Sequence, residues 1–202
     1  MKAAGKSLIL AVLLGVAGTG GRSAAAQAPG VDAAVLARAN AGDAAAQVQM
    51  GEHCVQQAAN EQDPELRPDE YKQAEAWYKK AAAQGDLNGE LHLAAFYRDG
   101  GKGFARDMVQ AAAWYRKAAE QGDVGAQGTL GLLYSMGQGV QQDPVEAYFW
   151  LDLAASEPGP RQEQYAANRQ MIGMQLTEDD VAAVRLRVKH WKAAHRPAGA
   201  TQ

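Results

Sequence analysis

Four histidines and one cysteine are the side chains in this sequence that most readily bind metals or act as nucleophiles. The histidines are His53, His92, His190 and His195. No two of them have the His-x-x-x-His spacing of a helical zinc site, and no His-Glu-x-x-His segment occurs. Cys54 directly follows His53, but adjacent residues on a helix point in different directions and do not form a nucleophile–base pair. These residues therefore predict no metal and no cofactor.

Other motifs of catalysis are weak. The segment Gly100-Gly101-Lys102-Gly103 faintly resembles a phosphate-binding loop. It lacks the Gly-x-x-x-x-Gly-Lys-Ser/Thr pattern and a preceding strand, so it is interpreted as a turn between helices. No Gly-x-Ser-x-Gly elbow is present. The acidic run Glu178–Asp180 comes where a helix is expected to begin, and the helix dipole favours negative charge there. The sequence does not predict an enzyme.

A segment that recurs about every 36 residues is the main pattern of the chain. Each copy contains one of three tryptophans, Trp77, Trp114 and Trp150, preceded by Ala-x-x and followed four residues later by a pair of alanines. This i, i+3, i+4, i+7, i+8 spacing places the small and aromatic residues on one face of a helix. We interpret that face as core packing between stacked repeats and not as a ligand pocket.

A second block precedes each tryptophan block and predicts a second helix in every unit. It begins at an aspartate that follows glycine, has a small residue eight positions later, and has a tyrosine or cysteine eleven positions later. Because Cys54 takes the place of a tyrosine that faces the core, we expect it to be buried; pairing with another molecule is the alternative for a lone cysteine. The aspartates are Asp43, Asp86 and Asp123, the small residues Gly51, Ala94 and Gly131, and the last positions Cys54, Tyr97 and Tyr134.

Joined together, these blocks resemble the Sel1-like repeat, a relative of the tetratricopeptide repeat. The resemblance covers roughly residues 33–155, and the period near 36 and the glycine-rich turn separate it from tetratricopeptide units of about 34 residues. It implies an all-α fold, an α/α superhelical solenoid that serves as a binding scaffold or adaptor. The first copy departs from the pattern, because a polar insertion at 57–69, with Pro64 and Pro68, replaces its glycine turn. That insertion is expected to be a functional or disordered loop.

The two ends of the chain complete the predicted domain organisation. Residues 1–26 have the layout of a secretory signal: Lys2 and Lys6, an apolar run over 7–16, and a small-residue motif that favours cleavage after Ala26. The apolar run is too short to span a bilayer, so a retained membrane anchor is the less favoured alternative. The predicted mature protein is exported, periplasmic or secreted. It comprises a solenoid of about three repeats at 27–156, a helical cap at 157–195 and a disordered tail at 196–202.

Within the cap, one helix is expected from about Arg161 to Met174. A second is expected to begin after Thr177, which is suited to be its N-cap with Asp180 in the capping-box position. The full chain has a formal net charge of −3. Removing residues 1–26 takes away three basic residues and no acidic ones, which makes the chain more acidic. This balance argues against a general nucleic-acid binder.

The candidate binding site is a stripe along the first helix of each repeat. In tetratricopeptide-like solenoids these helices line the concave surface, and the positions six, nine and thirteen after each aspartate lie away from the packing face. The stripe predicts a groove for a protein or peptide partner. An ordinary solvated face is the alternative interpretation of these residues, and binding of peptidoglycan or another envelope glycan is the alternative function. The stripe comprises Gln49, Glu52, Gln56, His92, Ala95, Asp99, Thr129, Leu132 and Met136.

Overall fold

The computed structural model describes residues 32–63, 65, 67–101 and 104–195. The predicted signal segment, Lys102, Gly103 and the predicted tail lie outside these residues. The described residues form nine helices and no β-strand, which confirms the all-α class. The helices are α1 (Ala33–Asn40), α2 (Ala44–Asn60), α3 (Arg67–Ala82), α4 (Leu87–Asp99), α5 (Met108–Glu120), α6 (Val124–Met136), α7 (Pro144–Ala155), α8 (Gln162–Gly173) and α9 (Glu178–Ala194).

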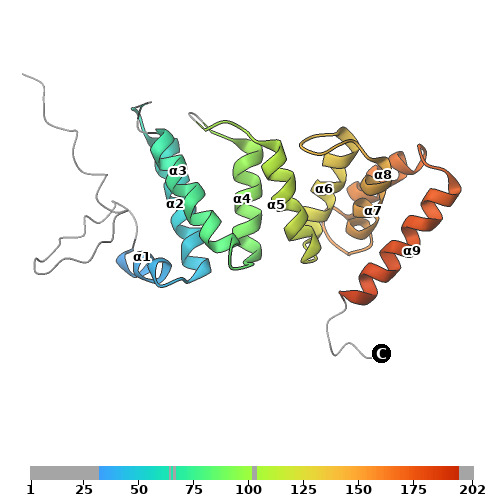
Figure 1. The fold of residues 1–202 in the computed structure, drawn as a ribbon, viewed down its shortest axis with the longest axis horizontal. Coiled ribbons are helices and arrows are strands. Elements are labelled where there is room, and N and C mark those ends of the chain that lie inside the picture. The colour runs from blue at the N-terminus through green and yellow to red at the C-terminus, as the bar shows by residue number, and fades with distance from the viewer. Residues whose placement is uncertain (1–31, 64, 66, 102–103, 196–202) are drawn as a thin grey trace, which may run out of the picture.

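The helices are arranged as a solenoid. Each helix from α1 to α7 packs against the one that follows it in the chain, and α2 also contacts α4. Figure 1 shows the result, a row of helices that runs from α1 at one end to α9 at the other. The three predicted repeats are therefore the helix pairs α2–α3, α4–α5 and α6–α7, and they share one continuous core, as expected for stacked repeats.

The repeated Gly-Asp pairs set the helix boundaries. The Asp86 carboxylate accepts a hydrogen bond from the Gly89 backbone N–H at 2.7 Å, which satisfies a donor in the first turn of α4. Gly85, directly before it, has a φ of +75°, a conformation that side chains other than glycine rarely adopt. Asp43 and Asp123 cap α2 and α6 in the same way. The chain thus reverses at each repeat boundary because of two residues that recur in the sequence.

The tryptophans differ in burial, which corrects the prediction that all three belong to the core. Trp150 is 4 % exposed, whereas Trp77 and Trp114 are partly buried at the edge of the core. Lys80 Nζ lies 3.8 Å from the centre of the Trp77 ring, and Lys117 covers Trp114 at the same distance. Of the three repeat tryptophans, the one in the last repeat is therefore the one that is enclosed.

The prediction of a long loop at 57–69 is wrong. α2 continues to Asn60, and α3 begins at Arg67, so most of the inserted residues lengthen these two helices. α2 has 17 residues, whereas α4 and α6 have 13 each. Pro68 fits this arrangement because proline is tolerated in the first turn of a helix, where its missing N–H has no partner to lose.

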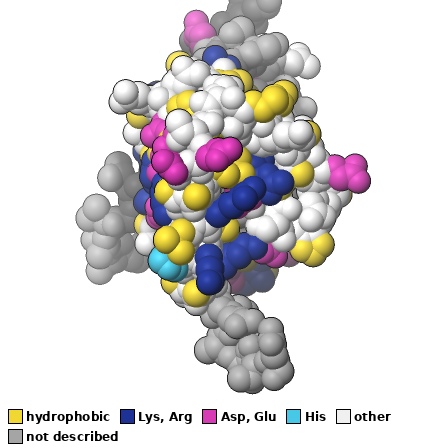
Figure 2. All heavy atoms as spheres, turned by 90° about the vertical axis from the view of Figure 1, so that its right-hand side faces the viewer, with side chains coloured by type: hydrophobic (Ala, Val, Ile, Leu, Met, Phe, Trp, Pro, Cys, Tyr) yellow, Lys and Arg dark blue, Asp and Glu magenta, His cyan; other side chains and the backbone are white. Residues whose placement is uncertain are grey.

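The C-terminal cap consists of α8 and α9, which both pack on α7. Thr177 and Asp180 form the predicted capping box at the start of α9, since each side chain bonds the other residue's backbone N–H. Figure 2 views this end of the molecule and shows lysine and arginine side chains gathered at its centre, with apolar and acidic side chains around them. The cap therefore closes the apolar core with a charged outer surface.

Candidate partner-binding surface

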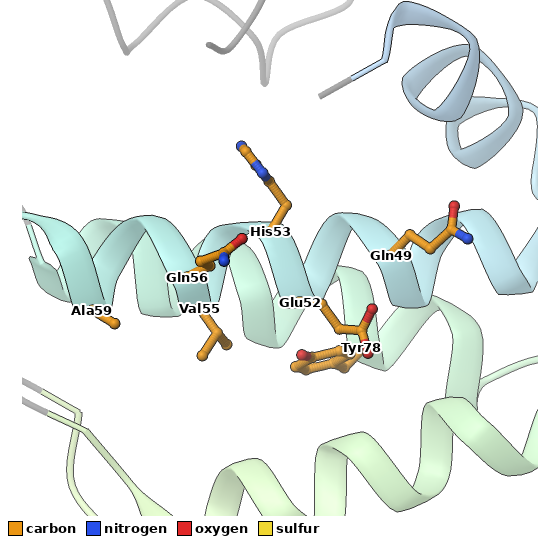
Figure 3. A pocket seen from close by; sticks show the side chains of 7 residues that line it. All are labelled: Gln49, Glu52, His53, Val55, Gln56, Ala59 and Tyr78. Carbon is orange, nitrogen blue, oxygen red and sulfur yellow. The ribbon is translucent and has the colours of Figure 1, made fainter. Parts of the chain in front are cut away.

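The first repeat carries an open hollow of about 470 Å³, here called the α2 hollow. Tyr78 of α3 forms part of its wall, and Figure 3 shows the Tyr78 ring beside Glu52. Three members of the predicted stripe, Gln49, Glu52 and Gln56, line it. The remaining lining residues are His53, Val55 and Ala59.

His92, a fourth stripe residue, borders this hollow from the next repeat. Its Nε2 atom lies 3.4 Å from Glu52 Oε1, and its ring stacks on Tyr78 with centroids 5.4 Å apart and an interplanar angle of 17°. These contacts join α4 to both helices of the first repeat. The sequence does not predict Tyr78 as a site residue. It directly follows Trp77, and the helical spacing of that block is the spacing of core positions.

Burial controls the protonation of the groups in the hollow. Burial raises the pKa of the Tyr78 hydroxyl, with further contributions from Glu52 and Cys54, so the phenol stays neutral. Burial also lowers the pKa of His53, which favours a neutral imidazole at pH 7. Glu52 is the one acidic residue among those that line the hollow. The hollow therefore combines neutral hydrogen-bonding groups with a single carboxylate.

The other stripe residues do not join this hollow. Asp99 lies at the end of α4 and forms two hydrogen bonds with Arg98, at 2.7 and 2.9 Å; these bonds hold the pKa of Asp99 below its ordinary value. Thr129 donates its hydroxyl hydrogen to the Gly125 carbonyl oxygen of its own helix. Leu132 and Ala95 are half-buried, and Met136 is 54 % exposed. The predicted stripe is thus a cluster of the three first-repeat residues and His92, together with separate positions elsewhere.

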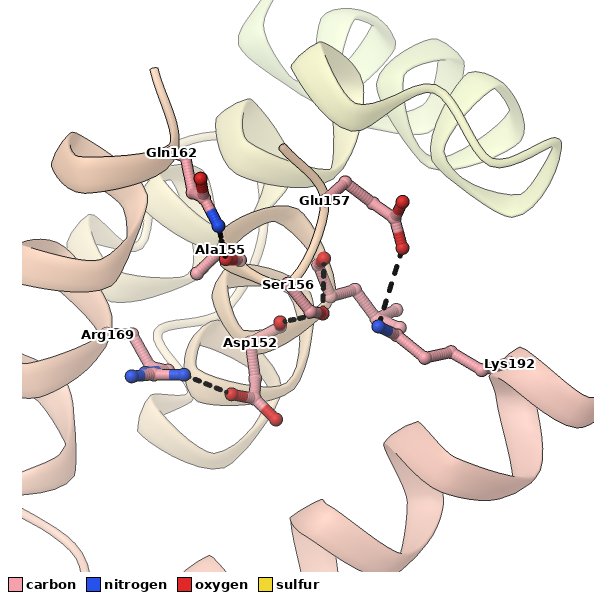
Figure 4. A network of polar contacts seen from close by, with 8 residues as sticks. Asp152, Ala155, Ser156, Glu157, Gln162, Arg169 and Lys192 are labelled. Atoms are coloured by element: carbon pink, nitrogen blue, oxygen red, sulfur yellow. Dashed lines mark hydrogen bonds and ion pairs between the residues drawn. The ribbon is translucent and has the colours of Figure 1, made fainter. Parts of the chain in front are cut away.

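The cap is held to the last repeat by polar contacts (Figure 4). Arg169 of α8 bonds Asp152 of α7 at 2.6 Å, and Lys192 of α9 lies 3.4 Å from Glu157. The Gln162 side chain donates to the Ala155 carbonyl oxygen at 3.2 Å. A second, smaller depression of about 360 Å³ lies between the end of α8 and the first turns of α9. These contacts position the cap and supply no reactive group.

Two searches of the described residues bear on chemistry. In the described ranges, no group of three or more His, Cys, Asp or Glu side chains is placed to hold a metal ion. No described helix is long and apolar enough to cross a membrane. Cys54 is 4 % exposed, as predicted, and burial raises the pKa of its thiol to about 12, with a contribution from Glu70. The α2 hollow is suited to binding, through hydrogen bonds and apolar contact.

The fold and the repeat boundaries define the class of protein as an α/α repeat solenoid. Comparison with known families adds the particular family: Sel1 repeats are matched at residues 44–86, 88–123 and 126–158, which together make up more than half of the chain. The protein belongs to the Sel1 repeat family. No curated protein sequence matches the chain. Sel1 repeats generally mediate protein–protein interaction, and proteins built from them are typically scaffolds without enzymatic activity.

The solved structures that are similar to this one include two with Sel1-type folds. The first is c5321, a protective antigen present in uropathogenic Escherichia coli strains displaying an SLR fold; it is 26 % identical, with a TM-score of 0.55, and the match covers 81 % of this chain and 40 % of that one. The second is a Sel1 repeat protein from Oxalobacter formigenes, 32 % identical with a TM-score of 0.53, covering 66 % of this chain and 95 % of that one. This chain therefore spans less than half the length of c5321.

Proposed function

We propose that this chain is an exported scaffold that binds an extended segment of a partner protein in the α2 hollow. The observation that carries the proposal is the convergence of α2, α3 and α4 there, through Glu52, Tyr78 and His92. An open hollow with apolar and hydrogen-bonding walls fits a peptide better than a small molecule, which is usually enclosed. The family membership supports the general role in protein–protein interaction.

The lining residues favour a particular kind of segment. Val55 and Ala59 offer apolar surface for one side chain of the partner, next to the buried Tyr78 ring. Gln49 and Gln56 are exposed amides that can donate to and accept from an extended backbone. Since Glu52 is the single acidic lining residue, a basic side chain on the partner would be favoured. We therefore propose a peptide that carries adjacent apolar and basic residues.

The binding test compares variants of the mature chain, residues 27–202, as baits for its own cell-envelope extract. Glu52→Lys combined with Gln56→Lys changes two exposed positions of the hollow. Glu163→Lys combined with Gln164→Lys makes the same changes at exposed positions of α8 and is the matched control. We expect a protein to be recovered with the unmodified chain and the control and to be lost with the hollow variant, and the purified partner to bind directly with the same order of affinities.

Two results would contradict the proposal. Equal recovery of every partner by the hollow variant would place binding elsewhere on the solenoid. Retention of the chain on purified cell wall, with no protein recovered, would favour the envelope-polymer function instead.

Export is a separate part of the proposal and rests on the sequence of residues 1–26. The test is expression of the full chain in a bacterial host, followed by fractionation and N-terminal sequencing. A chain that begins at Gln27 in the periplasm or the medium is expected. A full-length chain that remains in the cytoplasm would refute export and would leave the binding proposal intact.

A further inference from the structure

Three buried polar side chains occupy the same position in the three repeats. Gln47 is 5 % exposed, Glu90 is 4 % exposed and Gln127 is 2 % exposed. Each comes four residues after the aspartate that caps the first helix of its repeat. Buried polar groups destabilise a fold unless they are hydrogen-bonded. The bonds that these three residues make therefore decide how each repeat joins the one before it.

The two glutamines bond in an identical manner to the preceding helix. Gln47 Nε2 donates to the Ala39 carbonyl oxygen at 3.1 Å, and Gln127 Nε2 donates to the Ala119 carbonyl oxygen at 3.2 Å. Both acceptors lie eight residues earlier in the sequence, near the end of the previous helix. The equivalent acceptor for Glu90 is the carbonyl oxygen of Ala82, the last residue of α3.

Gln47 and Glu90 share a second bond, in which the side-chain oxygen accepts from a glutamine. Gln47 Oε1 accepts from the Gln84 side chain at 2.8 Å, and Glu90 Oε2 accepts from the Gln121 side chain at 2.9 Å. Gln84 and Gln121 hold equivalent places at the ends of α3 and α5. A carboxylate can accept such a bond but has no hydrogen to donate, whereas a protonated carboxyl group can do both. Ionised Glu90 can therefore make one of the two bonds that Gln47 makes, and it cannot make the backbone bond that Gln47 and Gln127 share.

The surroundings of Glu90 favour its protonated form. Burial raises the pKa of Glu90; Glu120 and Asp86 act in the same direction, while the Gln121 hydrogen bond and Lys117 oppose them. The start of α4 lies close against the end of α3, since a Cβ on the neighbouring Gly89 would meet Ala81 Cβ and the Ala82 backbone nitrogen at 2.7 Å. In the described part of the chain no lysine or arginine forms an ion pair with Glu90 within 4.0 Å.

We propose that Glu90 is a proton-dependent tie between the first and second repeats. In its protonated form it donates to the Ala82 carbonyl oxygen and fastens α3 to α4; when it ionises, that bond is lost and a charge is left buried in the α3–α4 seam. The stacking of His92 on Tyr78 also joins α4 to α3. This inference concerns the joint between repeats and stands without the proposed binding function.

The direction of the pH effect follows from the pKa. The pKa of Glu90 is raised on folding, so the folded chain holds its proton at pH values where the unfolded chain has lost it. The stability that the protonated Glu90 side chain adds to the fold is fully present below the ordinary carboxyl pKa. It is lost as the pH rises through the pKa of Glu90 in the folded chain. Glu90→Gln places a permanent donor and acceptor at this position, as in Gln47 and Gln127, and should remove this dependence.

The test is the melting temperature of the mature chain and of Glu90→Gln from pH 4 to pH 8. Glu163→Gln, an exposed position of α8, is the matched control. At pH 7.5 we expect Glu90→Gln to melt about 2–4 °C above the unmodified chain, the shift that one net hydrogen bond gives in a protein of this size. The difference should close toward pH 4, and Glu163→Gln should follow the unmodified chain throughout.

A second measurement locates the effect. Amide hydrogen exchange at the end of α3 and the start of α4, corrected for intrinsic rates, should be slowed by Glu90→Gln at pH 7.5 and unchanged at the end of α7. A melting-temperature difference that is absent, negative or independent of pH would overturn the proposal. Slower exchange spread evenly over all repeats would also overturn it, because it would indicate a general charge effect.

Discussion

Gly131→Ala provides a direct test of the packing between the two helices of the last repeat. Position 131 is equivalent to Ala94 of the middle repeat, where a methyl group is accommodated and fully buried. At Gly131 the added Cβ would lie 2.7 Å from Leu151 Cγ and 3.1 Å from the Ala147 carbonyl oxygen. Because Ala147 contributes a backbone atom, rotation of a side chain cannot relieve the overlap, and α7 would have to move.

Two opposing effects set the magnitude. Replacing glycine by alanine inside a helix favours folding by about 1 kcal/mol through helix propensity. Overpacking of a tight core costs about 1–3 kcal/mol and is greatest where the backbone must shift. We expect the cost to exceed the gain, with a net loss of about 1 kcal/mol and a melting temperature lower by about 2–4 °C.

Gly125→Ala is the matched control in the same helix, α6. Its Cβ would meet side-chain atoms only: the guanidinium of the exposed Arg161 at 2.9 Å and Asp123 Oδ1 at 3.2 Å. Here the propensity gain should dominate, and thermal unfolding followed by circular dichroism should show a stability equal to or above that of the unmodified chain. If Gly131→Ala proves as stable as Gly125→Ala, the close approach of α6 and α7 that underlies this reasoning is refuted.

Three further predictions follow from individual contacts. Asp123→Ala removes the N-cap of α6 and should cost about 1 kcal/mol in urea unfolding; an unchanged midpoint would contradict the capping role. Because burial raises the pKa of Cys54 to about 12, iodoacetamide at pH 8 should label it only after unfolding, and rapid labelling of the native chain would be inconsistent with this burial. Tyr97 donates to Glu75 at 2.5 Å; although burial acts the other way, hydrogen bonds from Lys79 and Tyr97 hold the pKa of Glu75 low. The stability that these bonds give the folded chain is lost as the pH falls below the ordinary carboxyl pKa. Tyr97→Phe should therefore lower the urea midpoint at pH 7 more than at pH 3. An equal loss at both pH values would count against the contact.

Local patterns in the sequence determined the helices and their boundaries. These patterns involve residues only a few positions apart. Examples are the Gly85–Asp86 pair before α4 and the capping box at Thr177. Such interactions depend on local backbone geometry, which recurs whenever the same residues recur. The repeat, the all-α class and the burial of Cys54 could therefore be predicted without a structure.

The candidate site could be predicted in part. The stripe identified Gln49, Glu52, Gln56 and His92, because residues on one side of a helix are fixed by its period. It did not identify Tyr78, because the spacing of its block predicts a core position. It also grouped these residues with Asp99 and the α6 positions, which the structure places outside the hollow. Whether stripes on successive helices form one surface depends on how the helices pack, and the period of a single helix carries no such information.

Only the tertiary structure distinguished residues that are equivalent in the repeat. Trp150 is enclosed, whereas Trp77 lies at the edge of the core. Gly131 has no space for a methyl group, because Leu151 and the Ala147 carbonyl oxygen lie against it, whereas its counterpart Ala94 carries a buried methyl group. Glu90 occupies a position where the other repeats have glutamine. Because it is buried between helices, this difference affects the stability of the fold. The sequence specifies which residues share a position, whereas the packing of neighbouring helices sets the space, the solvent exposure and the partners that each of them meets.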